Sequence, residues 1–355
     1  MELYLPVKVY SEADCVKRHG KELCALGTKA MIVTGRHSAV KTGALQDVTD
    51  ALGQMPYVVF DEIEENPSVE TVVKAADLAK AQKVDFVIGI GGGSPMDASK
   101  AIALLAANPR ETEEIFYESR KLPHLPVVCV PTTCGTGSEV TPYAVLTRHK
   151  LRTKKSISHR IFPELALMDA GYLRTMSREG LVNTCVDALA HLLESWLNVG
   201  SNDLNRLYTR EGLRLWGSFR NRLLEDLVRP EDYEIMLHAS MLAGMAISHT
   251  GTSLPHGLSY CITYEQGTPH GRAVGMFLGG FVEGYADQAE AKEAVRLLGF
   301  DSPTDFRVYM NRLLGKVPVS EELLQTTVKD LLVEPSKLKN YPGSLTETEL
   351  TAMVN

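Results

Sequence analysis

Short β-branched runs alternate with stretches of helical periodicity over the first half of this 355-residue chain. The β-branched runs are residues 30–34, 57–60, 85–90 and 127–130. Between the second and third runs, valines and alanines recur at helical spacing over 68–82, which predicts a helix packed on a sheet. Alternation of this kind is typical of βαβ units on a parallel sheet. We therefore predict an α/β domain with a parallel sheet in the N-terminal half.

From about Ser177 the pattern changes to long amphipathic runs, over 181–197, 203–227 and 233–249. These runs predict a mostly helical second domain whose first helix is capped by Ser177. A chain of 355 residues with 44% hydrophobic content has enough material for two hydrophobic cores. We place the predicted domains at residues 1–176 and 177–355.

Composition excludes several classes of function. The formal net charge is -7, and the one basic cluster, residues 148–155, is either a solvated turn between two strands or an anion site. The chain shows neither a secretory signal at its start nor an apolar run approaching the roughly 20 residues needed to span a bilayer. Its six cysteines form no C-x-x-C pair, which indicates reduced thiols. We expect a cytoplasmic protein without nucleic-acid or membrane partners.

A glycine cluster over residues 89–97 directly follows one predicted strand and leads into a helical pattern. Glycines allow a sharp turn and close approach to an anion, and we expect Ser94 to cap the helix and Pro95 to be its first residue. A pyrophosphate would fit the free N–H groups of such a helix start. The alternative is a turn that only joins strand to helix. The candidate cofactor-binding residues here are Gly91, Gly92, Gly93, Ser94 and Asp97.

A second turn, residues 131–139, is rich in hydroxyl groups and also follows a strand. Turns that follow neighbouring parallel strands lie at one edge of a sheet, where open α/β sheets bind their ligands. The two turns together therefore predict a nucleotide site better than either does alone.

Four residues of the second half have the chemistry of a metal site. Asp187 and His191 are four residues apart in a helical pattern and so share one face. His256 and His270 each stand between a proline and a glycine, one at the start of a helical segment and the other in a turn, and the glycines would leave room for an ion or substrate. One carboxylate and three imidazoles suit Fe²⁺ or Zn²⁺. Such an ion would stabilise an alkoxide or polarise an aldehyde carbonyl.

Several stretches together resemble the iron-containing, or group III, alcohol dehydrogenases of the dehydroquinate synthase-like superfamily. The matching stretches, in the order of the family, are residues 89–102, 131–141, 168–170, 186–191, 254–258 and 268–271. The resemblance implies an α/β N-terminal Rossmann-like domain with a parallel sheet, an all-α C-terminal domain, and a cofactor in the cleft between them.

The resemblance also implies a reaction and a ligand set. The metal, Fe²⁺ or alternatively Zn²⁺, would be held by Asp187, His191, His256 and His270, and a hydride would pass between the nicotinamide and a carbon whose oxygen is on the metal. The implied partners are a small alcohol or aldehyde and further copies of the chain, as a homodimer or larger oligomer. Thr132, Thr133, Ser138 and Lys155 match cofactor-contacting positions, although the segment from Lys155 to Asp169 is about two residues shorter than in the family.

Two departures from the family pattern bear on the cofactor and on proton transfer. NAD-preferring relatives often have an aspartate where this chain has Gly35, followed by Arg36, His37 and Ser38. Without that carboxylate the 2′-phosphate of NADP(H) has room and is not repelled by a negative charge, and Arg36, His37 or Ser38 could bind it. We therefore expect NADP(H) to be favoured over NAD(H). Tyr260 stands where many relatives have a histidine near the nicotinamide and substrate, and its hydroxyl could replace that histidine or the ring could simply pack.

The fold alone does not fix the reaction. The superfamily also includes glycerol dehydrogenases, maleylacetate reductases and dehydroquinate synthases, and a non-catalytic nucleotide-binding protein is the alternative from a different class. The complete set of four metal-ligand candidates favours a metal-dependent, NAD(P)(H)-linked alcohol dehydrogenase or aldehyde reductase.

Overall fold

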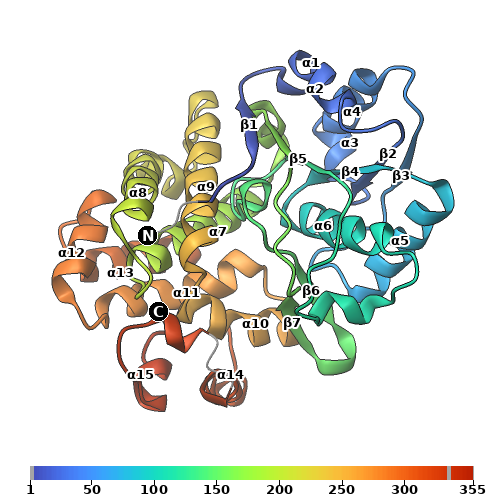
Figure 1. Cartoon of the computed structure of the whole chain (residues 1–355). Helices are drawn as coiled ribbons and strands as arrows, with labels where there is room; N and C mark the ends of the chain where they lie inside the picture. The colour runs from blue at the N-terminus through green and yellow to red at the C-terminus, as the bar shows by residue number, and fades with distance from the viewer. Residues whose placement is uncertain (1–3, 334–336, 355) are drawn as a thin grey trace. The chain divides into compact units, whose positions relative to one another are not determined.

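The computed structural model describes residues 4–333 and 337–354, which divide into two compact units (Figure 1). The N-terminal unit contains Tyr4–Thr133 and Gly137–Met176. The C-terminal unit contains Cys134–Thr136 and the chain from Ser177 onward.

A parallel sheet forms the centre of the N-terminal unit, with the strand order β1-β8-β5-β4-β2-β3. Its strands are β1 Lys8–Ser11, β2 Ala30–Thr34, β3 Tyr57–Phe60, β4 Phe86–Gly91, β5 Val127–Pro131 and β8 Leu165–Met168. The prediction of a parallel sheet is confirmed, and the four predicted strands are β2 to β5. The strands β1 and β8, which pair with each other, were not predicted.

Helices cover both faces of this sheet because its strands alternate their side chains between two hydrophobic clusters. In β2, Met31 and Val33 belong to the cluster that contains residues of α5 and α6, whereas Ala30 and Ile32 belong to the cluster on the other face. The helices are α1 Cys15–Arg18, α2 Gly20–Cys24, α3 Ser38–Lys41, α4 Ala44–Leu52, α5 Val69–Gln82 and α6 Gly93–Ala107, with short 3₁₀ turns at Glu113–Tyr117, Ser138–Val140, His149–Leu151 and Ala170–Thr175.

The start of α6 differs from its prediction. Gly92 is the N-cap and Gly93 the first helical residue, so Ser94 does not cap the helix and Pro95 is not its first residue. The reason is that β4 runs on to Gly91, whose φ of 149° lies in a region that favours glycine. The Ser94 hydroxyl instead accepts a hydrogen bond from the N–H of Asn66 at 3.1 Å.

The basic cluster lies in a two-stranded antiparallel hairpin of β6 Val145–Arg148 and β7 Thr153–Ser156. His149, Lys150, Leu151 and Arg152, between the two strands, are exposed. The hairpin therefore agrees with the first of the two interpretations, a solvated turn between two strands.

The C-terminal unit is helical in the part of it that the structure describes. Its helices are α7 Arg178–Trp196, α8 Asp203–Leu224, α9 Pro230–Thr250, α10 Leu254–Gln266, α11 His270–Glu283, α12 Gln288–Leu297, α13 Pro303–Leu314, α14 Glu321–Val333 and α15 Glu347–Thr351, with a 3₁₀ turn at Leu338–Asn340. Ser177 caps α7 as predicted, accepting from the N–H of Gly180 at 3.1 Å. None of the helices described combines the length and apolar character that crossing a bilayer requires.

The first of these helices, α7, lies at the centre of the unit. It contacts α8, α9, α10 and α11, and every residue from Cys185 to Trp196 is buried. A helix that is buried on all sides holds its side chains in fixed directions, because its neighbours leave few alternative rotamers. This helix therefore positions the polar residues described next.

Candidate metal and cofactor sites

One face of α7 carries three buried acidic or imidazole side chains. Asp187, His191 and Glu194 follow one another at intervals of four and three residues, which places them on the same face of the helix. Their exposed fractions are 4%, 6% and 0%. Polar groups buried to this extent need partners, which come here from two other helices and one loop.

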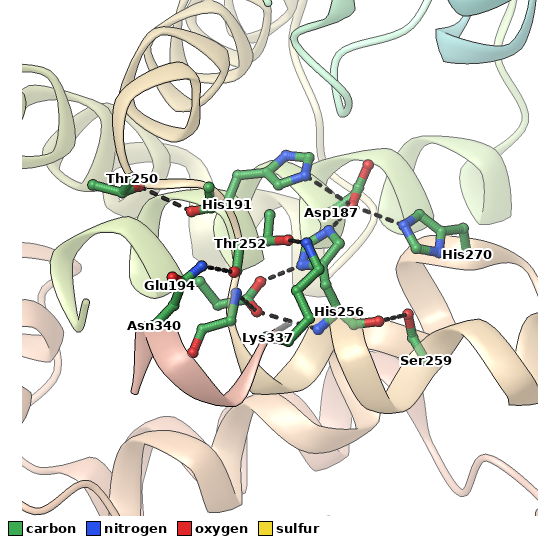
Figure 2. A network of polar contacts seen from close by, with 12 residues as sticks. Asp187, His191, Glu194, Thr250, Thr252, His256, Ser259, His270, Lys337 and Asn340 are labelled. Carbon is green, nitrogen blue, oxygen red and sulfur yellow. Dashed lines mark hydrogen bonds and ion pairs between the residues drawn. The ribbon is translucent and has the colours of Figure 1, made fainter. Parts of the chain in front are cut away.

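His256 is brought to this face by the first turn of α10. It is 2% exposed, and its Nδ1 contacts the Oε2 of Glu194. Because a carboxylate can only accept, Nδ1 must donate, and Nε2 is left facing the Oδ1 of Asp187 at 3.3 Å. The ring thus lies between two carboxylates (Figure 2).

His191 has the same tautomer for a similar reason. Its Nδ1 faces the backbone carbonyl oxygen of Gly135 at 3.2 Å, and a carbonyl oxygen only accepts. Its Nε2 is left 3.8 Å from the Oδ1 of Asp187, and its ring stacks on that of His256 with the centroids 4.5 Å apart.

His270 is the first residue of α11 and His256 is the third residue of α10, so both histidines lie in the first turn of a helix. The expectation that one of them lies in a turn outside a helix is therefore wrong. Its Nε2 lies 3.8 Å from the Oδ1 of Asp187. The neighbouring glycines do not leave open room, which corrects a second expectation. A Cβ on Gly271 would overlap the carbonyl oxygen of Asn183, and one on Gly257 would lie 2.7 Å from Leu331. These glycines allow close packing of helices instead.

Three imidazoles therefore direct Nε2 at one carboxylate oxygen. Ligand atoms of Asp187, His256 and His270 lie within 4.8 Å of one another. His191 lies outside this group of three, but its Nε2 is 3.8 Å from the Oδ1 of Asp187 and its ring stacks on that of His256. Neither the Oδ1 of Asp187 nor the Nε2 of His256 makes a hydrogen bond within the described residues, although both are buried. Buried, unbonded donor atoms that converge in this way fit a divalent cation.

The charges of this cluster suit such a cation. Burial alone would raise the pKa of Asp187, but the neighbouring histidines, led by His191, hold it well below its usual range. Burial lowers the pKa of His191. Burial would also lower the pKa of His256, but the carboxylates of Glu194 and Asp187 outweigh it and raise that pKa to about 9.

The first residues of the two predicted cofactor turns lie side by side in the N-terminal unit. The N–H of Thr132 donates to the carbonyl of Gly91 at 2.8 Å, and a Cβ on Gly92 would lie 3.2 Å from the hydroxyl of Thr133. Gly93 and Ser94 form the first turn of α6 beside them. The hydroxyl of Thr132 is buried and has no hydrogen-bond partner within the described residues.

Asp97 and Ser138 have their polar atoms engaged within the chain. The Ser138 hydroxyl donates to Asp97 at 2.5 Å, the N–H of Val145 donates to the same carboxylate at 2.8 Å, and the ammonium of Lys100 donates to the Ser138 hydroxyl at 2.8 Å. Lys100 is fully buried and was not among the predicted site residues. These bonds hold the second turn against α6, so both predicted residues support the turn.

Gly35 and Arg36 follow β2 at the same edge of the sheet as Gly91, since Thr34 pairs with Ile90 of β4. Arg36 is exposed, and so are His37 and Ser38. A side chain on Gly35 would meet the carbonyl oxygen of Ile63 at 3.1 Å.

β7 contains two adjacent lysines, Lys154 and the predicted Lys155. Lys154 is the one that lies beside the glycine turn. Lys155 is exposed, whereas Lys154 is buried and donates to the Oδ1 of Asn66 at 2.6 Å. Asn66 in turn donates to the Ser94 hydroxyl. Strand alternation explains the difference, because adjacent residues of a strand point to opposite faces.

Tyr260 packs against the histidine cluster. Its ring stacks on that of His270 with the centroids 6.0 Å apart, and the ammonium of Lys337 lies 6.0 Å from its centroid. Sequence reasoning also missed Glu194 and Lys337. The spacing of Glu194 from Asp187 and His191 was a usable signal, but nothing local marks Lys337.

Comparison with known proteins agrees with these features. The family model for iron-containing alcohol dehydrogenases matches residues 6–170, and the model for the C-terminal domain of that family matches residues 181–331. A Thermotoga maritima iron-containing alcohol dehydrogenase is 36% identical, with a TM-score of 0.91 over 99% of this chain and 98% of that one. A Bifidobacterium kashiwanohense sulfoacetaldehyde reductase, solved with NAD⁺, is 27% identical, with a TM-score of 0.87 over 99% and 97% of the two chains.

Sequence relatives have several activities. A mitochondrial hydroxyacid-oxoacid transhydrogenase of Caenorhabditis elegans is 33% identical over 69% of this chain, and the match spans 59% of that relative's length. An aldehyde-alcohol dehydrogenase of Streptococcus pneumoniae is matched over 32% of its length. The lactaldehyde reductase of Escherichia coli K12 is 30% identical over 75% of this chain and 69% of its own length. From the two family models and these relatives, we conclude that the chain belongs to the iron-containing alcohol dehydrogenase family.

Proposed function

We propose that this chain is a metal-dependent, NAD(P)(H)-linked alcohol dehydrogenase or aldehyde reductase. The observation that carries the proposal is the convergence of three imidazole Nε2 atoms on the Oδ1 of Asp187, at 3.3 to 3.8 Å, in a buried site. In this proposal residues 1–176 bind the dinucleotide, and residues 177–355 bind metal and substrate.

The ligands of the proposed ion are Asp187, His191, His256 and His270, and Fe²⁺ or Zn²⁺ would suit them. The ion would supply Lewis-acid polarisation of the C–O group of the substrate, and the nicotinamide would exchange a hydride with its carbon. The protein's part is to direct Nε2 of His191 and His256 at the ion and to hold both rings in place through contacts at Nδ1. Tyr260, stacked on His270, is proposed as a wall of this site.

The N-terminal unit is proposed to bind NADP(H) in preference to NAD(H). The side-by-side turns of residues 91–94 and 132–133 support dinucleotide binding. The hydroxyl of Thr132, which has no hydrogen-bond partner among the residues that the structure describes, is a group that a bound cofactor would satisfy. Gly35 beside exposed Arg36 supports a 2′-phosphate at the end of β2.

The test is initial-rate oxidation of NADPH and NADH by protein stripped of metal and then reloaded with Fe²⁺ or Zn²⁺. Short aldehydes form the substrate panel, with lactaldehyde and sulfoacetaldehyde included because relatives act on them by name. Restored activity with an NADPH preference is expected. An NADH preference would contradict only the cofactor proposal, and absence of metal binding would contradict the function.

A variant separates the metal site from the fold. His256→Ala should fold, should lose most of its bound metal and should lose turnover with every aldehyde that the wild type reduces. Metal content by elemental analysis and the far-UV circular dichroism spectrum check both points. A folded variant with full metal content and activity would remove His256 from the mechanism.

Two further properties are proposed from the resemblance. We expect a homodimer or larger homo-oligomer, which light scattering during size-exclusion chromatography measures directly. We also expect a cytoplasmic enzyme, in line with the free thiols of all six cysteines.

A further inference from the structure

Glu194 lies directly behind His256, on the side of the ring away from Asp187 (Figure 2). Its side chain is fully buried, and it is not one of the four proposed ligands. A fully buried carboxylate is costly unless both of its oxygens accept hydrogen bonds. The partners of Glu194 therefore indicate why this position holds an acid.

Both oxygens of Glu194 accept from α10 or its N-cap. Oε1 accepts from the N–H of Ser253 at 2.8 Å and from that of His256 at 3.2 Å, while Oε2 accepts from the Nδ1 of His256. Ser253 is the N-cap of α10, but its side chain makes no cap hydrogen bond. The side chain of Glu194, from α7, thus caps the N-terminus of α10, and the dipole of α10 favours the negative charge of that carboxylate.

This arrangement acts on the ring of His256 in two ways. It holds a proton on Nδ1, so that Nε2 is the nitrogen that faces Asp187 and that would bind an ion there. It also fixes the rotation of the ring, because the same carboxylate holds the backbone N–H of the same residue. Glu194 therefore connects the helix of Asp187 and His191 to the helix of His256.

A cation and an amide hold the neighbouring segment in place. The ammonium of Lys337 donates to the hydroxyl of Thr252 at 2.5 Å, and the side chain of Asn340 donates to the Thr252 carbonyl at 2.7 Å. Burial lowers the pKa of Lys337, and the negative charge of Glu194 acts in the opposite direction. These contacts hold the segment before α10, which contains Ser253, without using the oxygens of Glu194.

We propose that Glu194 is a positioning residue of the metal site, which raises metal affinity by holding His256 in its Nδ1–H tautomer with Nε2 aimed at the ion. The inference rests on the proposed metal site. Partners of this kind behind a ligating histidine are worth about 10–100-fold in metal affinity.

The experiment compares Co²⁺ binding by metal-free wild-type protein and by Glu194→Gln, in competition with a chelator. The glutamine oxygen can still accept from the two backbone N–H groups, but its NH₂ group then faces Nδ1 and favours the opposite tautomer. We expect Co²⁺ to bind about 10–100-fold more weakly, with an altered visible absorption spectrum.

Asp232→Asn is the matched control. Asp232, in the first turn of α9, is also a fully buried carboxylate of the same unit, but its partners are Arg222 and the N–H of Arg229. The control should lose stability in urea and keep the wild-type Co²⁺ affinity and spectrum. A merely structural role for Glu194 would make the two variants behave alike.

A measurement without any variant covers the case in which Glu194→Gln does not fold. Nitrogen-15 NMR of histidine-labelled, Zn²⁺-loaded wild-type protein should show Nδ1 of His256 protonated and Nε2 bound to metal. Metal ligation through Nδ1, or wild-type Co²⁺ affinity and spectrum in Glu194→Gln, would overturn this inference alone. Failure of the wild type to bind Co²⁺ or Zn²⁺ would overturn the proposed function as well.

Discussion

Glu139 shows how a single buried acid shapes the pH dependence of stability. It is 2% exposed, its Oε1 has no hydrogen-bond partner within the described residues, and burial raises its pKa to about 7. The unfolded chain would lose this proton near pH 4.5, the ordinary value for the group. Between these pH values the folded state binds more protons than the unfolded state, so stability falls as the pH rises.

We predict that Glu139→Gln removes this loss, because glutamine resembles the protonated acid and does not titrate. Near pH 4.5 the variant and the wild type should have similar free energies of unfolding, whereas at pH 8 the variant should be more stable by up to about 3 kcal/mol. Urea unfolding at both pH values measures the difference. Parallel pH profiles of the two proteins would contradict the prediction.

The two lysines of β7 give a second prediction at this scale. Lys154 is buried beside the turn that we propose binds the pyrophosphate, and Lys155 is exposed. Lys154→Met should weaken NADPH binding at least about tenfold, the usual worth of a hydrogen bond to a charged group. Lys155→Met, the control, should leave it unchanged. Fluorescence titration with NADPH measures the affinity of both variants. A larger loss of affinity in Lys155→Met would assign the cofactor contact to Lys155 instead.

The candidate ligands could be predicted because each one carries its own signal. Asp187 and His191 stand at helical spacing, and His256 and His270 stand in matching proline-glycine settings. Lys154 was not singled out beside Lys155 because the face to which a strand residue points depends on register, which a one-residue shift reverses. Glu194 was not predicted because its role depends on the packing of α10 against α7, which is a contact between residues that are far apart in the chain.

At the scale of elements, long periodic segments were predicted well and short ones were not. The helices α5 and α7 have caps and buried faces that the sequence displays. The strands β1 and β8 have four residues each and form by pairing with each other across the length of the N-terminal unit. Local periodicity over four residues is too brief to predict a strand. The role of Gly257 and Gly271 was predicted wrongly for a related reason. Only the packed helices show which atoms occupy the space where a side chain at these positions would lie.

Gly271 leads to a prediction about the packing of two helices. An alanine there would place its Cβ on the carbonyl of Asn183, so α11 would have to move away from α7. We expect Gly271→Ala to cost about 1–3 kcal/mol or more of stability and to weaken metal binding, because His270 moves with α11. The control is Gly284→Ala at the other end of α11, where the nearest atom would be a carbonyl oxygen at 3.1 Å. Urea unfolding and Co²⁺ titration test both variants, and equal effects would contradict the prediction.

At the scale of the whole molecule, the sequence predicted a parallel sheet followed by helices but not the strand order. Alternating strands and helices require crossover connections, which make the strands parallel. The order β1-β8-β5-β4-β2-β3 depends on which strands pair, and pairing is a property of distant segments. The pairing of β1 with β8 brings the first described strand beside the last strand of the unit.

The two units should respond separately to their ligands, which is the last prediction. The proposed ion joins α7, α10 and α11, so a metal-free protein loses a link between three helices of the C-terminal unit. A ligand that binds only the folded arrangement stabilises it by about 2.7 kcal/mol at a concentration of 100 times its Kd. We expect Zn²⁺ to slow hydrogen exchange in α7, α10 and α11 and NADPH to slow it in the turn before α6. Protection by Zn²⁺ should vanish in His256→Ala, and Zn²⁺ protection confined to the sheet would place the ion elsewhere.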